Sequence, residues 1–326
     1  MAITDIAYVV FDHTDLAAAE RFYTDFGLKV AYRTEEEVAF RPALARGYCY
    51  VACKAAAPGL RAIAFSASTR GDLEVASHFP EASAITAIER EGGGEKVTLA
   101  SPDGLPFEIV YGIQPYDELE VRAALVINHG RAKRRHGEFQ RPPMEPAPVL
   151  RLGHVALLTN DFKSNFEWMQ SRLGLRPTDI MYGKDESDLV GAFMHLGGAA
   201  EWTDHHTLAL FPDPDSRMHH ISFEVEDIDA QGMGNHWMRR QGWRPTWGIG
   251  RHIYGSQMFD YWFDPEGNIA EHFTDGDLVR PGTPPALVAL DDESLYAWGP
   301  PMEPADFVGM AARHKPTTDE SGQGRA

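Results

Sequence analysis

The sequence predicts an α+β protein made of two tandem halves, each with the element order β-α-β-β-β. The prediction comes from internal similarity, because repeated segments at a large spacing indicate a duplicated unit. Three pairs of segments match in their apolar pattern and turn residues: 6–28 with 153–175, 61–68 with 219–226, and 101–112 with 264–276.

The first repeated segment is expected to form a strand, a turn and an amphipathic helix. IAYVVFDHTDLAAAERFYTDFGL and GHVALLTNDFKSNFEWMQSRLGL align without a gap at an offset of 147, which pairs Ile6 with Gly153. Acidic and small polar residues typically precede a helix, and glycine typically follows its end. Helix starts are therefore expected at Thr14-Asp15 and Asn160-Asp161, and helix ends at Gly27 and Gly174.

The last repeated segment is expected to be a hairpin that ends on a carboxylate. In DYWFDPEGNIAEHF, residues 260–273, the turn is Asp264-Pro265-Glu266-Gly267, where proline fixes φ and glycine allows a positive φ. Side chains after the turn alternate inward and outward. Glu271 then falls where an inward-facing side chain is expected, in an apolar and aromatic strand.

The chain divides by composition into four parts. The basic, then proline-rich run GRAKRRHGEFQRPPMEPAP reads as a linker, and proline is again frequent after about residue 278. We expect a first half over 1–135, a linker over 136–150, a second half over 151–280, and a proline-rich tail over 281–326. The tail should lie extended on the body, with its last residues disordered.

Charge and cysteine content exclude several classes of protein. The 326 residues carry 48 acidic and 30 basic side chains, a net charge of −18, which disfavours binding to nucleic acid or anionic membranes. No apolar run is long enough for a membrane span or a signal peptide. Cys49 and Cys53 lie four apart on one strand, too far for an easy disulfide. A cytoplasmic protein is expected.

The two halves differ in chemistry at three strand positions. In the alignment above, His154 pairs with Ala7, His220 with Ala62, and Glu271 with Glu108. A lone strand histidine is usually structural, but three ligand-type residues gathered in one half indicate a site.

Two imidazoles and one carboxylate are the donor set of a mononuclear non-haem iron(II) site with open coordination positions. The mixed set favours Fe(II) or Mn(II), and zinc is the less favoured ion. A bound cation would also compensate the charge of Glu271 in its apolar hairpin.

The stretch GRHIYGSQMFDYWFDPEGNIAE, residues 250–271, resembles the signature of the type I extradiol ring-cleavage dioxygenases of the vicinal oxygen chelate superfamily. The matching residues are Gly250, His252, Tyr261, Asp264, Pro265, Gly267 and Glu271. Asp260 departs from the pattern, since an aliphatic residue is usual there. The resemblance extends over roughly residues 3–280, and it implies that each half is a pair of βαβββ modules forming a partly open barrel.

The resemblance implies a role for each site residue. His154, His220 and Glu271 look like the metal ligands, with His220 chosen as the second histidine of MHHISFEVED and His219 expected to face away. His206 of HHTLALF looks like the acid/base histidine. His252 and Tyr261 look like the residues that hydrogen-bond the bound diol and oxygen. Three other histidines are expected to be structural or surface residues: His195, His236 and His272.

The implied reaction is extradiol cleavage of a catechol-type diol or triol by O₂ at Fe(II), with Mn(II) as the alternative. It gives a muconic semialdehyde-type product in aromatic catabolism, and a homo-oligomer is expected. Monocyclic, methylated or trihydroxylated, and bicyclic diols stay open as substrates. Four tryptophans could wall the pocket or belong to the core: Trp202, Trp243, Trp247 and Trp262.

Three other functions fit the same scaffold. A glyoxalase-like lyase or isomerase would use Zn or Ni with ligands from both halves, which Ala7 and Ala62 disfavour. A non-catalytic binder would not need the two histidines and the glutamate. A hydroquinone- or gentisate-type dioxygenase uses similar ligands, and only substrate tests separate it.

Overall fold

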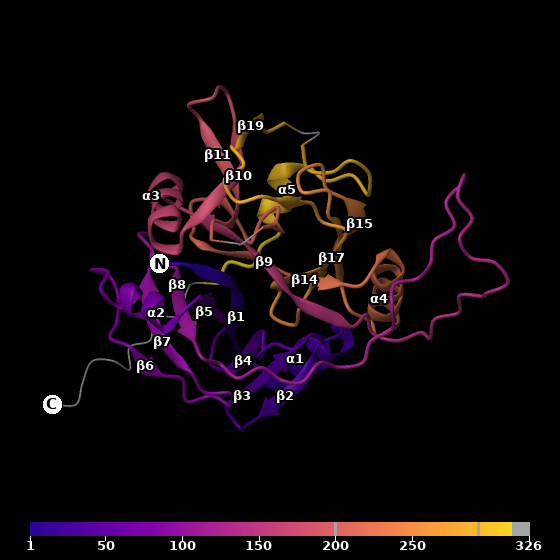
Figure 1. Ribbon diagram of the computed structural model, residues 1–326, viewed down its shortest axis with the longest axis horizontal. Coiled ribbons are helices and arrows are strands. Elements are labelled where there is room, and N and C mark those ends of the chain that lie inside the picture. Colours follow the sequence, from indigo (N-terminus) through magenta and orange to yellow (C-terminus); the bar gives the residue numbers. More distant parts are fainter. Residues whose placement is uncertain (199–200, 292–293, 315–326) are drawn as a thin grey trace.

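The computed structural model describes residues 1–198, 201–291 and 294–314. The first half contains two modules that each run strand, helix and three strands (Figure 1). The first module is β1 (Ile3–His13), α1 (Leu16–Phe26), β2 (Lys29–Arg33), β3 (Glu37–Arg41) and β4 (Tyr50–Lys54). The second is β5 (Gly59–Ala67), α2 (Arg70–Ser77), β6 (Thr86–Ala87), β7 (Glu95–Ala100) and β8 (Pro106–Tyr111).

The second half repeats this plan with small additions. Its first module is β9 (Val149–Thr159), α3 (Phe162–Trp168), the π-helix η1 (Met169–Leu173), β10 (Leu175–Tyr182), β11 (Leu189–Leu196), β12 (Thr203–Asp204) and β13 (Leu208–Pro212). Its second is β14 (Arg217–Val225), α4 (Ile228–Arg240), β15 (Pro245–Arg251), β16 (Met258–Phe263) and β17 (Ile269–Thr274). Strand β18 (Leu278–Val279) follows this module, and the tail adds β19 (Ala286–Ala289) and α5 (Pro304–Gly309).

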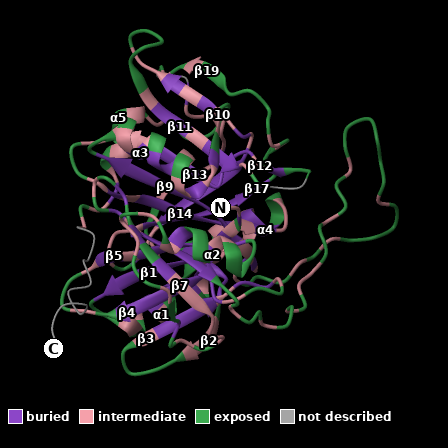
Figure 2. Ribbon diagram, turned by 60° about the vertical axis from the view of Figure 1, so that its left-hand side comes forward, coloured by how far each residue is buried: buried purple, intermediate pink, exposed green. Residues whose placement is uncertain are grey.

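Each half forms one mixed sheet in which the two modules meet through their first strands. The strand orders are β2-β3-β4-β1-β5-β8-β7-β6 and β15-β16-β17-β14-β9-β13-β11-β10-β19. Both orders have two ends, so over the described residues each sheet is curved but open. This confirms the α+β fold of two tandem halves, each a pair of βαβββ modules, that the family resemblance implies. The single β-α-β-β-β order read for each half from the internal repeats is wrong, because each half contains that order twice. Buried strands of both sheets lie at the centre of the molecule in Figure 2.

The strand register corrects the ungapped alignment of the two halves. Ala62 lies opposite Val10, and His220 lies opposite Ala156, so β5 and β14 correspond as predicted. On the same strands, however, Tyr8 lies opposite Ala64 and His154 opposite Ser222. The structural equivalent of His154 is therefore Tyr8, and the predicted pairing with Ala7 is wrong.

The π-helix after α3 causes this one-residue error in the alignment. The N-cap residues Asp15 and Asp161 stand 146 positions apart, whereas the left-handed glycines that end the helices, Gly27 and Gly174, stand 147 apart. A π-helical turn takes one more residue than an α-helical turn. The single-residue insertion therefore lies within η1, and strand β1 must be shifted by one.

The tail lies on the second sheet. Strand β19 pairs in parallel with β10, and Phe307 of α5 joins a buried cluster with Trp247, Phe259 and Tyr261. The predicted disorder at the end of the chain falls on residues 315–326, outside the described residues. Within the described ranges, no helix is both long and apolar enough to cross a membrane.

Between the halves, residues 112–148 are all described and form neither helix nor strand. Most of this segment leaves the body as a long arm, drawn in magenta at the right of Figure 1.

Candidate metal centre

The predicted ligands lie on three adjacent strands, β9, β14 and β17, in the middle of the second sheet. Strand pairing sets Glu271 opposite Ser222, and Ser222 opposite His154, while His220 lies two residues along β14 on the same face. The three ligand atoms all lie within 4.8 Å of one another, and all three side chains are buried. Sheet register alone therefore gathers residues far apart in the sequence.

The hairpin that carries Glu271 forms as the sequence predicts. Gly267 has a φ of +85° and donates its N–H to the carbonyl of Asp264. The Asp264 carboxylate accepts the N–H groups of Glu266 and Asn268, which locks the turn. Strand β17 therefore leaves the turn with Glu271 facing the interior.

Glu271 is fully buried, and neither of its carboxylate oxygens accepts a hydrogen bond of ordinary geometry from any described residue. Its Oε2 lies 3.2 Å from Nε2 of His154 and 3.5 Å from Nε2 of His220. Burial acts to raise the pKa of Glu271, but the neighbouring His154 leaves that pKa below its usual value. A buried carboxylate whose oxygens accept no hydrogen bond of ordinary geometry calls for a cation between these atoms.

A second histidine behind His220 fixes which nitrogen of His220 faces the centre. Nε2 of His219 lies 2.9 Å from the carbonyl oxygen of Phe307, which can only accept, so His219 is protonated there. Nδ1 of His219 must then accept from Nδ1 of His220, 2.7 Å away. The lone pair on Nε2 of His220 is left facing Glu271, as a metal ligand requires. His219 was expected to face away; it is buried behind the ligand and also borders the pocket.

The pair His205 and His206 repeats this arrangement beside the centre. Nε2 of His205 lies 2.8 Å from the Asp179 carboxylate, and Nδ1 of His205 lies 3.1 Å from Nδ1 of His206. With the His205 proton on the side of Asp179, His206 is protonated at Nδ1 and bare at Nε2. Burial, followed by the neighbouring His154, holds the pKa of His206 well below its usual value. Neutral His206 therefore enters the site as a proton acceptor.

His252 and Tyr261 form a third set at the edge of the centre. Nδ1 of His252 donates to the carbonyl of Leu295, 2.7 Å away, so the Tyr261 hydroxyl donates to Nε2 of His252, 2.8 Å away. Burial and the nearby Glu271 raise the pKa of Tyr261 well above its usual value, which keeps the phenol protonated. The lone pairs of the Tyr261 oxygen stay available to accept a proton from a ligand.

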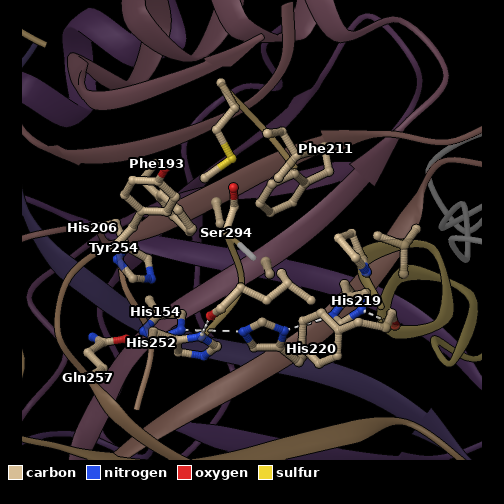
Figure 3. Close-up of a pocket in the computed structure, with 18 of the residues that line it drawn as sticks. His154, Phe193, His206, Phe211, His219, His220, His252, Tyr254, Gln257 and Ser294 are labelled. Carbon is tan, nitrogen blue, oxygen red and sulfur yellow. Dashed lines mark hydrogen bonds between the residues drawn. The ribbon is translucent and has the colours of Figure 1, made fainter. Parts of the chain in front are cut away.

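These groups meet in one pocket. His154, His206, His220, His252 and Tyr261 all line it, and Figure 3 shows the histidines facing a common space. The structure thus brings together every predicted site residue, with Glu271 beneath them. The remaining wall includes Phe193 and Phe211, while the four tryptophans named above do not line it.

Asp260, the departure from the family signature, points away from this pocket. Its carboxylate accepts hydrogen bonds from Trp262 Nε1 at 2.7 Å and Asn235 Nδ2 at 2.9 Å. Burial raises the pKa of Asp260 to about 7. Any effect of Asp260 is therefore expected on the face of the sheet opposite the pocket.

Sequence reasoning missed His205 and Asp179, and the tail segment that covers the pocket. Adjacent histidines were the one available signal for His205. Asp179 lies 26 positions earlier on another strand, and only the fold shows that β10 runs beside this segment.

Comparison with known proteins finds both similar sequences and similar structures. Residues 151–271 match the family model for the Glyoxalase/Bleomycin resistance protein/Dioxygenase superfamily. The chain is 33% identical over 314 residues to Metapyrocatechase 2 of Cupriavidus necator, covering 94% of this chain and 92% of that protein.

Two solved structures share the fold. The Mn(II)-bound glyoxalase from Novosphingobium aromaticivorans has a TM-score of 0.80 at 19% identity, covering 98% of this chain and 97% of that one. Homoprotocatechuate 2,3-dioxygenase from Brevibacterium fuscum, in complex with 3,4-dihydroxyphenylacetate, has a TM-score of 0.77 at 22% identity, covering 96% and 93%.

Proposed function

The chain belongs to the Glyoxalase/Bleomycin resistance protein/Dioxygenase superfamily, among its extradiol ring-cleaving dioxygenases, and we propose that it cleaves catechol-type rings with O₂ at His154, His220 and Glu271. The observation that carries this proposal is the buried Glu271 carboxylate, which accepts no hydrogen bond of ordinary geometry from a described residue and faces two imidazoles. The ring bond beside the diol breaks, and both atoms of O₂ enter the ring-opened product.

Fe(II) is the ion we propose, with Mn(II) as the alternative, because two imidazoles and a carboxylate on one face suit non-haem iron and leave positions open. The bound ion would polarise the two diol oxygens and provide an electron path from the ring to O₂. Within the chain itself, the lone pairs on Nε2 of His220 and on Glu271 are already turned toward one point.

His206 is the residue we propose for proton transfer. Its bare Nε2 can take a proton from one hydroxyl of the entering diol and hold it until an oxygen of the reacting group needs it. The contact with His205 keeps the other ring nitrogen protonated throughout. Asp179 and His205 are thus positioning residues for His206.

His252 and Tyr261 would orient the second diol oxygen. The Tyr261 hydroxyl is directed toward His252, so its oxygen accepts from the ligand and does not donate to it. The pocket walls exclude water around these groups, which strengthens each hydrogen bond.

The reaction is tested by loading the protein with Fe(II) without oxygen and then following O₂ uptake with a panel of catechols, trihydroxybenzenes and hydroquinones. We expect one O₂ consumed per diol and a yellow ring-opened product, lost in His220→Ala and kept in His236→Ala, which changes an exposed histidine on α4. Tight metal binding with no O₂ uptake from any diol would reject the proposal.

We also propose that the protein is a cytoplasmic homo-oligomer. Both cysteines are buried free thiols, which supports a reducing compartment. The arm over 112–148 supports association, because it exposes a set of large apolar side chains: Val126, Ile127, Phe139 and Met144.

A further inference from the structure

The pocket above the metal centre has two chemically distinct ends. The polar end holds the histidines and Tyr261, where the two diol oxygens would lie. The other end is mostly apolar and lies between strands of the second sheet and the tail, and its main residues are Met181, Phe193, Phe211, Tyr254 and Leu290. Figure 3 shows Phe193 and Phe211 on the side of the pocket away from His220.

The apolar end offers no charged partner for a charged group. None of the described residues that line the pocket is lysine, arginine, aspartate or glutamate. Arg251, on the neighbouring strand β15, is already engaged, since its guanidinium donates to the Ser256 carbonyl and to Asp275.

The one hydroxyl among the tail residues at this end, on Ser294, is also occupied. It is bound within its own turn, where it donates to Asp291 at 2.6 Å and accepts the Asp291 N–H at 2.9 Å. The hydroxyl of Tyr254, a residue that packs against Phe193, also interacts with Ser294. A substituent that reaches this end of the pocket therefore meets mostly carbon and no cation.

Resting on the proposed function, we infer that the substrates of this chain are catechols whose ring substituent is uncharged and apolar, and that catechols bearing a carboxylate side chain are rejected. An alkyl group buries its surface against these side chains and gains hydrophobic free energy. A carboxylate there would lose most of its water and find no cation, which is strongly unfavourable. The substrate is thus recognised as a molecule with a diol at one end and a hydrocarbon at the other.

The inference also places the enzyme in a reaction sequence. Hydroxylation of an uncharged arene at two adjacent ring carbons, or of a phenol at one, gives a diol without an acidic side chain. The reaction that supplies this substrate is therefore expected to be ring hydroxylation of a neutral hydrocarbon or phenol.

Three catechols whose ring substituents have similar shapes test the inference: 4-propylcatechol, 3,4-dihydroxyphenylacetamide and 3,4-dihydroxyphenylacetate. On the Fe(II)-loaded protein we expect kcat/KM to fall in that order, with the carboxylate about 100-fold below the propyl compound. Dissociation constants measured without oxygen should follow the same order, since the discrimination arises on binding. Values for the carboxylate and propyl compounds within threefold of each other would overturn the inference.

A variant adds the missing charge. Leu290 is half-buried at the apolar end, so an arginine there can keep its stem along the wall and its guanidinium near the opening. We expect Leu290→Arg to raise kcat/KM for the carboxylate at least about tenfold relative to the amide, and Leu290→Gln to leave that ratio unchanged.

The two proposals fail in different ways. If no diol of any charge consumes O₂ while the metal is bound, the proposed function is wrong. If diols are cleaved without regard to side-chain charge, the function stands and the inference about substrate class is wrong.

Discussion

Glu108 in the first half and Glu271 in the second occupy equivalent places in the two sheets, and their buried charges are compensated in different ways. Glu108 lies opposite Ala64 and Glu271 opposite Ser222, at matching positions of matching strands. Glu108 accepts the Tyr8 hydroxyl at 2.6 Å and the Lys96 ammonium at 2.5 Å. Both of its oxygens are therefore satisfied by the protein.

Glu271 has no partner that corresponds to Tyr8 or Lys96. His154 stands at the position of Tyr8, and His220 at that of Ala62, and both direct a ring nitrogen toward the carboxylate. A buried carboxylate that is paired with a lysine ammonium needs no bound metal ion. A buried carboxylate that faces imidazole lone pairs does need one. One scaffold thus yields an internal ion pair in one half and a metal centre in the other.

The largest expected effect separates the two glutamates directly. Glu271→Gln removes the charged ligand, so kcat/KM should fall at least about 1,000-fold, more than the 10–100-fold typical of groups around a metal, and bound metal should be lost. Glu108→Gln should keep its metal and activity within about threefold. Metal content by mass spectrometry and O₂ uptake check both variants; equal losses would contradict the division of roles.

A second difference between the halves concerns pH. Asp260 is a buried acid whose pKa is raised by burial to about 7, and the corresponding residue in the first half is the apolar Val97. An unfolded aspartate has a pKa near 3.9, so between about pH 4 and 7 the folded state holds the extra proton. Stability is then lost as pH rises through this window, by up to about 4 kcal/mol from this group.

Denaturant unfolding from pH 4 to 8 measures the contribution of Asp260. In Asp260→Asn the stability should fall less steeply with rising pH than in the wild type. Parallel curves for the two proteins would show that Asp260 is ionised normally in the folded state.

The pair His205 and Asp179 gives a smaller effect, confined to proton transfer. Asp179→Asn leaves the ligands intact but no longer holds the His205 proton on its own side, so His206 loses its fixed tautomer. We expect kcat to fall about 10–100-fold with KM and metal content nearly unchanged. Asp185→Asn, an exposed acid in the following turn, serves as the control; a raised KM with normal kcat would indicate a structural role instead.

The smallest effect is expected at the ion pair of the first half. Lys96→Met leaves Glu108 with Tyr8 alone, which should lower the free energy of unfolding by about 1–3 kcal/mol. Metal content should not change, because the centre lies in the other sheet. Lys54→Met, at an exposed lysine, should leave stability within about 0.5 kcal/mol of the wild type; an unchanged stability for Lys96→Met would mean that Glu108 needs no cation.

The sequence predicted the two-half fold and brought forward six site residues that the structure places around one pocket. The prediction worked where residue type and turn chemistry act locally, as at Glu271 after its Asp-Pro-Glu-Gly turn. The ungapped alignment was wrong by one residue at Tyr8, because a π-helix adds one residue without any marked change in composition. Asp15 and Asp161, aligned as helix caps, would have located the insertion.

The rest could not be predicted, since it depends on which segments meet in space. The contact of Asp179 with His205 needs β10 to pair with β11, which in turn pairs with β13. The roof of the pocket comes from the tail, seventy or more residues after His220. Neither contact leaves a periodic pattern in the chain.

The most direct test is anomalous diffraction at the iron edge from crystals of the Fe(II)-loaded protein grown without oxygen. We predict one strong peak per chain, about 2.0–2.2 Å from Nε2 of His154, Nε2 of His220 and a carboxylate oxygen of Glu271, by analogy with metal–nitrogen and metal–oxygen distances at other protein sites. No peak is expected near Glu108. A peak beside Glu108, or iron bound without contact to Glu271, would contradict the assignment of one half to metal binding and the other to an internal ion pair.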